Sequence, residues 1–206
     1  FHDFSCFLTM FVESKLRAQI SAVDSARRYS DQLGVDVFMG RGAFTGKNSI
    51  EVNGKTLTFA KAVIATGGTA AVPNIPGLAD ARYLTNSSVF NLTELPPRLG
   101  VIGAGPIGLE LAQAFQRLGS QVTVFSRSEK IMPKEEPEAV ELVKEALLKD
   151  GVIFAYNSNY KRIEGQEENE PVRVILDEDG KDKVLEFDAL LIATGRKPSV
   201  TGLGLE

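Results

Sequence analysis

The sequence predicts an α/β protein, and three observations carry this prediction. An apolar strand at Leu99–Ile102 runs into the glycine-rich segment Gly103–Gly108, and an amphipathic helix then continues to Leu118. A second strand, Gln121–Phe125, follows after Gly119, and a further buried strand is expected at Ala189–Thr194. A strand, a glycine-rich turn, a helix and a second strand in this order predict a Rossmann-like unit.

The first part of the chain carries apolar residues at helical spacing. Within residues 3–33 they recur every four positions, at Leu8, Val12, Leu16 and Ile20. Gly34 follows as a residue suited to end a helix. This pattern predicts a helix whose apolar face packs on a core.

Short strands are expected next. Val35–Met39 and Ser49–Val52 are apolar runs, and Asn53-Gly54 is a hairpin signal because a type I′ turn needs positive φ at both central residues. Lys55–Phe59 is the expected returning strand. Lys61–Thr66 is expected to be a buried strand that ends at a glycine pair.

Prolines punctuate the polar stretch that follows, which predicts a hinge or crossover over residues 73–96. Beyond the Rossmann-like unit, a helix is expected at Glu138–Lys149, with one apolar face: Ala139, Leu142, Val143, Ala146 and Leu147. Further strands are expected at three places, 152–156, 172–176 and 183–187, the last two joined by a turn at Asp179-Gly180.

Two segments of the chain resemble each other. Phe59–Gly67 and Phe187–Gly195 share Phe, Ile, Ala, Thr and Gly at the same spacing, and a hairpin is expected before each. The second copy is preceded by the glycine-rich segment that starts at Gly103. By the same spacing, the corresponding segment of the first copy would lie upstream of Phe1, so we expect the chain to be an internal fragment.

Composition excludes several classes of protein. The net charge of −4 argues against a general nucleic-acid binder, and no apolar run approaches the length that crosses a bilayer. Cys6 is the single cysteine and His2 the single histidine. A disulfide framework, a cysteine-based metal site and a histidine-assisted nucleophile are therefore not expected within the chain.

Gly103-Ala104-Gly105-Pro106-Ile107-Gly108 fits the pattern G-x-G-x-x-G in the context that the pattern requires. Gly103 suits a tight turn, Gly105 allows close approach of a pyrophosphate, and Gly108 allows close packing of helix and strand. The N-terminus of the following helix offers free N–H groups to an anion. The segment therefore predicts dinucleotide binding.

The residues after the second strand indicate which dinucleotide is bound. Sites for NAD usually carry Asp or Glu here, which accepts hydrogen bonds from the ribose 2′-hydroxyl. This chain has Ser126-Arg127-Ser128, with Lys130 close behind. Cations and hydroxyl donors favour a 2′-phosphate, so the sequence predicts NADPH.

Four motifs together resemble the pyridine nucleotide-disulfide oxidoreductases, the flavoprotein family of glutathione reductase, dihydrolipoamide dehydrogenase and mercuric reductase. They are Val63–Gly67, Pro73–Gly77, Val101–Glu110 and Ile192–Pro198. Further short segments, including Phe90–Pro96, are most similar to the mercuric reductases. The resemblance spans almost the whole chain.

The resemblance implies an NAD(P)H domain inserted into a partial FAD domain. Residues 1–72 would be the later part of the FAD domain, 97–194 the NAD(P)H domain, and 195–206 the return into the FAD domain. The redox cysteine pair and the C-terminal dimerisation domain of the family would lie outside the chain. The fragment alone is therefore expected to be inactive, with an incomplete FAD site and no catalytic residue, while the parent enzyme would be a homodimer.

The resemblance also assigns roles to single residues. Glu110 would lie near the nicotinamide, Arg127 would hold the 2′-phosphate, and Ser126 takes the place of the acid of NADH-dependent members. Gly195 would approach the nicotinamide. The expected cofactor-binding residues are Ala65, Thr66 and Gly67 toward FAD, and Gly103, Ala104, Gly105, Pro106, Ile107, Gly108, Glu110, Ser126, Arg127, Ser128 and Gly195 toward NADPH. Arg196, where the chain would return into the FAD domain, completes the set.

Alternatives remain open at this point. A flavin-dependent NAD(P)H dehydrogenase without redox cysteines would share these motifs, and so would a non-enzymatic NADPH-binding module. A methyltransferase shares the glycine-rich loop but leaves the repeated Ala-Thr-Gly strands unexplained. No metal, membrane or nucleic-acid partner is expected, and the final substrate and the compartment stay open.

Overall fold

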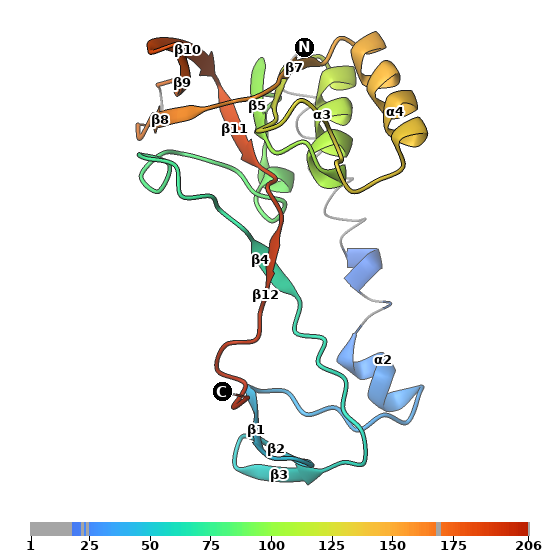
Figure 1. Ribbon diagram of the computed structural model, residues 1–206. Helices are drawn as coiled ribbons and strands as arrows, with labels where there is room; N and C mark the ends of the chain where they lie inside the picture. Colours follow the sequence, from blue (N-terminus) through green and yellow to red (C-terminus); the bar gives the residue numbers. More distant parts are fainter. Residues whose placement is uncertain (1–17, 22, 24, 168–169, 206) are drawn as a thin grey trace. The chain divides into compact units, whose positions relative to one another are not determined.

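The computed structural model divides into two compact units (Figure 1). The residues that it describes are 18–21, 23, 25–167 and 170–205. Unit 2 is Gly68–Lys197, and unit 1 holds the described residues up to Gly67 and those from Pro198 onward. Cys6, His2 and most of the helix expected over residues 3–33 lie outside the described residues. Within that range, α2 (Ala26–Asp31) has no buried residue.

Unit 1 contains a small antiparallel sheet of β1 (Gly42–Gly46), β2 (Ser49–Val52) and β3 (Lys55–Thr58), in that order. The turn between β2 and β3 has φ of 51° at Asn53 and 76° at Gly54. The predicted hairpin is therefore confirmed, because its turn residues accept the positive φ that joins the two strands.

Two strands predicted in unit 1 are not formed. Neither Val35–Met39 nor Lys61–Thr66 has strand structure, and Met39 and Val63 are 73% and 92% exposed. Both predictions were wrong because they rested on apolar composition. A strand also needs a neighbour to accept its backbone hydrogen bonds, and no described strand pairs with either segment.

Unit 2 is built on a parallel sheet, as predicted. Its strand order is β11 (Ala189–Ile192), β5 (Arg98–Ile102), β6 (Gln121–Phe125) and β7 (Ile153–Ala155). Every neighbouring pair in it is parallel. Helix α3 (Pro106–Leu118) connects β5 to β6, and α4 (Pro137–Lys149) connects β6 to β7.

A second, antiparallel sheet of unit 2 has the order β10 (Lys181–Phe187), β9 (Val172–Glu178) and β8 (Tyr160–Glu164). The turn at Asp179-Gly180 has φ of 53° and 80°, as a type I′ turn requires. The sequence pattern missed four strands: β1, β8, β4 (Gly68–Ala70) and its partner β12 (Arg196–Pro198). These segments are short and rich in glycine or charge.

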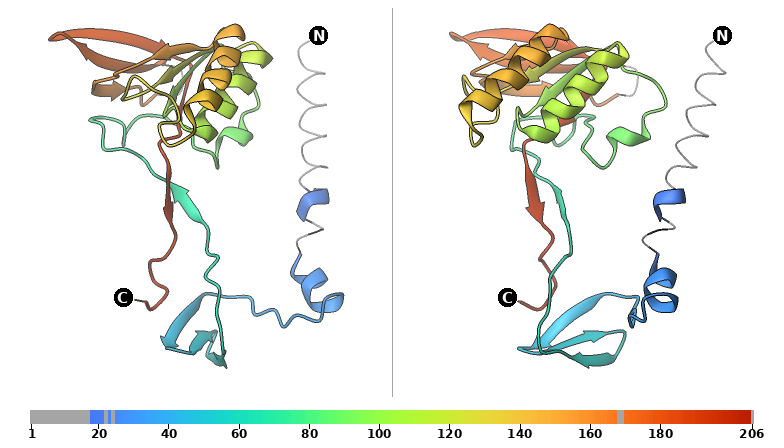
Figure 2. Two further views of the ribbon diagram at one scale, coloured as in Figure 1. Left: turned by 45° about the vertical axis from the view of Figure 1, so that its right-hand side comes forward. Right: turned by 90° about the vertical axis from the view of Figure 1, so that its right-hand side faces the viewer.

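The parallel sheet is covered on both faces. Leu99, Val101 and Leu191 face the core that contains α3 and α4, whereas Ile102 and Leu190 face the core shared with β8–β10. The views show the resulting three layers, helices, parallel sheet and antiparallel sheet, with α3 and α4 side by side (Figure 2). Because both faces are buried, β5 and β11 are nearly continuous apolar runs.

The apolar face predicted for α4 is only partly correct. Leu147 is 1% exposed and Val140 packs on the same core, but Leu142 is 70% exposed. Val143, Ala139 and Ala146 are also exposed. Since Val140 and Leu147 are two turns apart, a narrow stripe is enough to attach the helix to the sheet.

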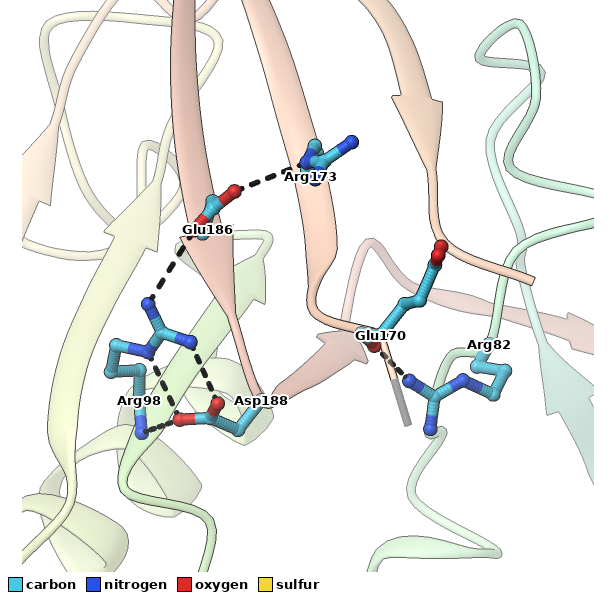
Figure 3. A network of polar contacts seen from close by, with 6 residues as sticks. All are labelled: Arg82, Arg98, Glu170, Arg173, Glu186 and Asp188. Carbon is cyan, nitrogen blue, oxygen red and sulfur yellow. Dashed lines mark hydrogen bonds and ion pairs between the residues drawn. The ribbon is translucent and has the colours of Figure 1, made fainter. Parts of the chain in front are cut away.

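The segment 73–96 crosses unit 2 and packs on it, with Ile75, Leu78, Ala81 and Val89 buried. Just beyond it, Arg98 at the start of β5 holds the corner between β10 and β11 (Figure 3). Its backbone N–H and guanidinium donate to the Asp188 carboxylate at 2.8, 3.0 and 2.8 Å. Glu186 bridges Arg98 to Arg173. This network attaches the antiparallel sheet to the start of β5 in the parallel sheet.

Candidate functional site

A cavity of about 1000 Å³ lies in unit 2, at the carboxyl ends of the parallel strands. The last residues of β5, β6 and β11, which are Ile102, Phe125 and Ile192, form its floor, and the segments that follow these strands form its walls. In α/β sheets of this kind, ligands bind at the carboxyl edge of the strands. The cavity is therefore the candidate site.

Backbone hydrogen bonds hold the segments that follow the strands next to one another at the end of the sheet. The first residue after each strand donates to the last residue of the neighbouring strand. These bonds join Ala193 N to Ile102 O (2.8 Å), Gly103 N to Phe125 O (3.1 Å) and Ser126 N to Ala155 O (2.9 Å). Residues far apart in the sequence thus meet in one place because the parallel register continues past the strand ends.

Two positions of the glycine-rich turn accept only glycine. Gly103 has φ of 119°, and a Cβ there would lie 2.4 Å from Ala193 O. A Cβ on Gly108 would lie 2.2 Å from Gly103 O. By contrast, a Cβ on Gly105 would have nothing within 4 Å, so this position borders open space. The turn and the close packing predicted for Gly103 and Gly108 are both present.

The N-terminus of α3 faces this open space without a protein cap. Gly105 is the N-cap residue and has no side chain to accept from the helix, Pro106 is the first helical residue, and the first turn carries no acid. The free N–H groups and the helix dipole favour an anion at this point.

The segment after β6 differs from the prediction in one respect. The hydroxyl groups of Ser126 and Ser128 both donate to the backbone carbonyl of Lys130, at 2.9 and 3.0 Å. A hydroxyl has one proton to donate, so neither serine is a free donor for a phosphate. The serines instead shape the turn that presents Arg127 and Lys130.

The cavity wall is cationic although the chain carries a net charge of −4. Its charged residues are Arg127, Lys130, Lys134, Arg196 and a single acid, Glu135. Within the described part of the chain, the Arg127 and Lys130 side chains have no ion pair or hydrogen bond. The guanidinium of Arg196 donates to Gly68 O. The Lys134 side chain likewise makes no such contact among the described residues, so three cations are available to a bound anion.

The structure brings most of the predicted residues together. Those that line the cavity are Gly103, Ala104, Gly105, Pro106, Ile107, Ser126, Arg127, Ser128, Gly195 and Arg196. Gly108 is buried beneath the turn, and Glu110 is exposed on α3 outside the lining. Ala65, Thr66 and Gly67 belong to unit 1, where Thr66 donates to Ser199 O at 2.6 Å.

The sequence pattern missed other lining residues. These are Pro73–Pro76, Asn86, Met132–Glu135 and the segment Ser158–Tyr160. The last segment lies between β7 and β8, and β8 itself was not predicted. No sequence motif marks it, because its place at the cavity depends on how the two sheets pack.

The described residues offer neither a metal site nor a membrane-spanning helix. Among them, no group of three or more His, Cys, Asp and Glu side chains is arranged to hold a metal ion. No described helix is long and apolar enough to span a membrane.

Comparison with known proteins agrees with this geometry. Residues 6–206 match the sequence profile of the family described as pyridine nucleotide-disulphide oxidoreductase. The chain belongs to this family. It is 41% identical over 175 residues to a mercuric reductase of Bacillus cereus and 38% identical over 176 residues to one of Staphylococcus aureus. The predicted family and its mercuric reductase-like character are thereby confirmed.

Two solved structures share the fold of this chain over part of their length. The HOCl-induced flavoprotein disulfide reductase RclA of Escherichia coli is 32% identical, with a TM-score of 0.73 over 86% of this chain and 40% of that one. LpdA of Mycobacterium tuberculosis is 26% identical, with a TM-score of 0.73. The chain spans 27% of the Bacillus cereus mercuric reductase and 32% of the Staphylococcus aureus one.

Proposed function

We propose that this chain carries the NADPH-binding part of a flavoprotein oxidoreductase. In the whole enzyme, hydride would pass from NADPH to FAD and then to a disulfide or to Hg(II). One observation carries the proposal. The cationic cavity lies at the carboxyl edge of the parallel sheet, with the turn Gly103–Gly108 and the uncapped end of α3 opening onto it.

The dinucleotide fits this cavity by the chemistry of its groups. The pyrophosphate would lie over Gly105, where the backbone leaves room and the N–H groups of α3 can donate to it. Arg127 would hold the 2′-phosphate, with Lys130 beside it. Both side chains are exposed and unpaired among the described residues, so they can turn toward the ligand without breaking an ion pair.

The nicotinamide end would lie near Gly195 and Arg196, which follow β11 at the other side of the cavity. When bound, NADPH supplies the hydride. The chain would bind and orient NADPH, with the turn after β11 at its nicotinamide end and the turn after β6 at its 2′-phosphate end. Glu110 lies outside the cavity lining, so we assign it no contact.

We further propose that the residues of unit 2 from 97 to 194 are the inserted NAD(P)H domain and that unit 1 belongs to the FAD domain. Two features support this assignment. The chain crosses between the units twice, near Gly67 and near Pro198, as an insertion requires. Ala65, Thr66 and Gly67 repeat the motif that ends β11, and in the FAD domain they would approach FAD.

Titration calorimetry with NADPH and with NADH tests the proposal. We expect NADPH to bind at least tenfold more tightly, because Arg127 makes a charge-assisted hydrogen bond to the 2′-phosphate, worth about 1.5–3 kcal/mol. Arg127→Ala should remove this preference. Arg173→Ala is the matched control, since Arg173 lies on β9 outside the cavity lining. Equal affinity for both nucleotides would show that Arg127 does not bind a 2′-phosphate. No binding of either nucleotide would show that the cavity is not a dinucleotide site.

A further inference from the structure

Each copy of the repeated Phe-to-Gly motif contains a threonine whose hydroxyl donates a hydrogen bond within its own unit. In unit 2, Thr194 donates to Ala71 O at 2.5 Å. In unit 1, Thr66 donates to Ser199 O at 2.6 Å. The two bonds correspond, because the sequence offset that relates Thr66 to Thr194 also relates Ala71 to Ser199. Each threonine therefore binds the segment that follows the other copy.

A backbone hydrogen bond accompanies each of these threonine bonds, next to the paired strands β4 and β12 (Figure 1). In unit 2, Ala71 N donates to Gly195 O at 2.9 Å. Ala71 therefore contacts two consecutive residues of the second copy, because its carbonyl accepts from Thr194 and its N–H donates to Gly195. Gly195 is thus held on both sides, through its own carbonyl and through the side chain of the residue before it.

Gly195 is a residue whose conformation has to be fixed by its neighbours. It lines the cavity together with Thr194, its φ is 131°, and a Cβ on it would meet nothing within 4 Å. Glycine has more backbone freedom than any other residue, so nothing in Gly195 itself restricts it to one conformation. The two bonds to Ala71 restrict it before a ligand arrives, and this lowers the entropic cost of binding.

We propose that Thr194 is a positioning residue for the nicotinamide end of NADPH, because its hydroxyl, bound to Ala71 O, holds Gly195 in the conformation that accepts this end. The proposal rests on the proposed function, since it requires NADPH in the cavity with its nicotinamide near Gly195. The hydroxyl has one proton, which Ala71 O accepts, so Thr194 acts through Gly195 and not as a donor to the ligand. Thr66 makes the equivalent bond outside the cavity lining and has no such role.

The test compares Thr194→Val with Thr66→Val in the 206-residue chain. Valine keeps the branched shape and lacks the hydroxyl, so each change removes one of the two corresponding bonds. Affinity is measured by calorimetry for NADPH and for adenosine 2′,5′-bisphosphate, which has no nicotinamide. We expect Thr194→Val to weaken NADPH by about three- to tenfold, as for one lost hydrogen bond, and to leave adenosine 2′,5′-bisphosphate within about twofold. Thr66→Val should change neither affinity.

Thr194→Ser is the rescue variant. It keeps the hydroxyl, so its affinity for NADPH should lie within about twofold of the wild type. Thr194 is exposed, so Thr194→Val should remain folded, and its binding of adenosine 2′,5′-bisphosphate checks this.

Four results would overturn the proposal: unchanged NADPH affinity in Thr194→Val, an equal loss for both ligands in that variant, an equal loss of NADPH affinity in Thr66→Val, or no rescue by Thr194→Ser. If the wild type binds neither ligand, the proposed function itself fails.

Discussion

The two copies of the Phe-to-Gly motif share a sequence pattern and differ in structure. In the second copy, Ala189–Ile192 form β11, and Leu190 and Leu191 are completely buried. In the first copy the corresponding residues form no strand, and Val63, which matches Leu191, is 92% exposed. Both copies are preceded by a three-stranded antiparallel sheet.

The difference between the copies comes from their neighbours. β11 pairs with β5 on one side and meets Leu84 on the other, so its backbone groups are satisfied and its side chains enter two cores. No described strand lies beside the first copy. The comparison shows that the preceding hairpins are local structures, whereas the motif itself becomes a strand only where a partner strand is present.

The largest effect on stability is expected from truncating Leu191, with the matching residue Val63 as its control. Leu191→Ala should lower the free energy of unfolding of unit 2 by about 2–5 kcal/mol, because it leaves a cavity under α3. Val63→Ala should change stability by less than about 0.5 kcal/mol, since the side chain is exposed. Urea unfolding followed by circular dichroism measures both. Equal losses in the two variants would show that the first copy is also packed.

A smaller effect is expected at the glycines that end the two copies. Gly195 has φ of 131° and Gly67 has φ of 69°, and a Cβ on either would meet nothing within 4 Å. The cost of alanine is therefore backbone strain alone. We expect about 1–3 kcal/mol for Gly195→Ala and about 1 kcal/mol for Gly67→Ala, whose φ lies in the left-handed region that other residues sometimes adopt. Thermal melting should rank them in this order, and the reverse order would contradict the strain argument.

The smallest effect concerns Asp188, which stands where the first copy has Ala60. Hydrogen bonds from Arg98 hold the pKa of the Asp188 carboxyl below its ordinary value (Figure 3). Its folded pKa is depressed, so the stabilisation is present above the ordinary pKa of about 3.9 and is lost as pH falls through the folded pKa. Asp188→Asn should cost about 1 kcal/mol at neutral pH, since the pair is partly exposed.

Urea unfolding of the wild type and Asp188→Asn at neutral and acid pH checks this prediction. The difference between the two proteins should shrink as pH is lowered from about 4 to about 2. A difference that stays constant with pH would show that the carboxylate charge is not the cause.

Much of unit 2 and of its cavity was predictable because local patterns specify it. The strand, glycine turn and helix from Leu99 to Leu118 formed as predicted, and both hairpin turns have the positive φ that their Asn-Gly and Asp-Gly pairs indicate. Tyr160 was not predictable in the same way. It reaches the cavity only because the antiparallel sheet packs over the ends of β6 and β7, and a charged five-residue strand leaves little sequence signal.

The sequence by itself therefore determined the turns, the glycine-rich loop and the family, since each depends on residues close together along the chain. Tertiary structure decided which apolar runs became strands, which face of α4 was buried, and which hydroxyl groups were hydrogen-bonded within the protein. Lys61–Thr66 stayed exposed for lack of a partner strand, and the Ser126 and Ser128 hydroxyls were taken by Lys130 O. Backbone and hydroxyl groups need hydrogen-bond partners, and only the folded chain determines which groups lie close enough to be those partners.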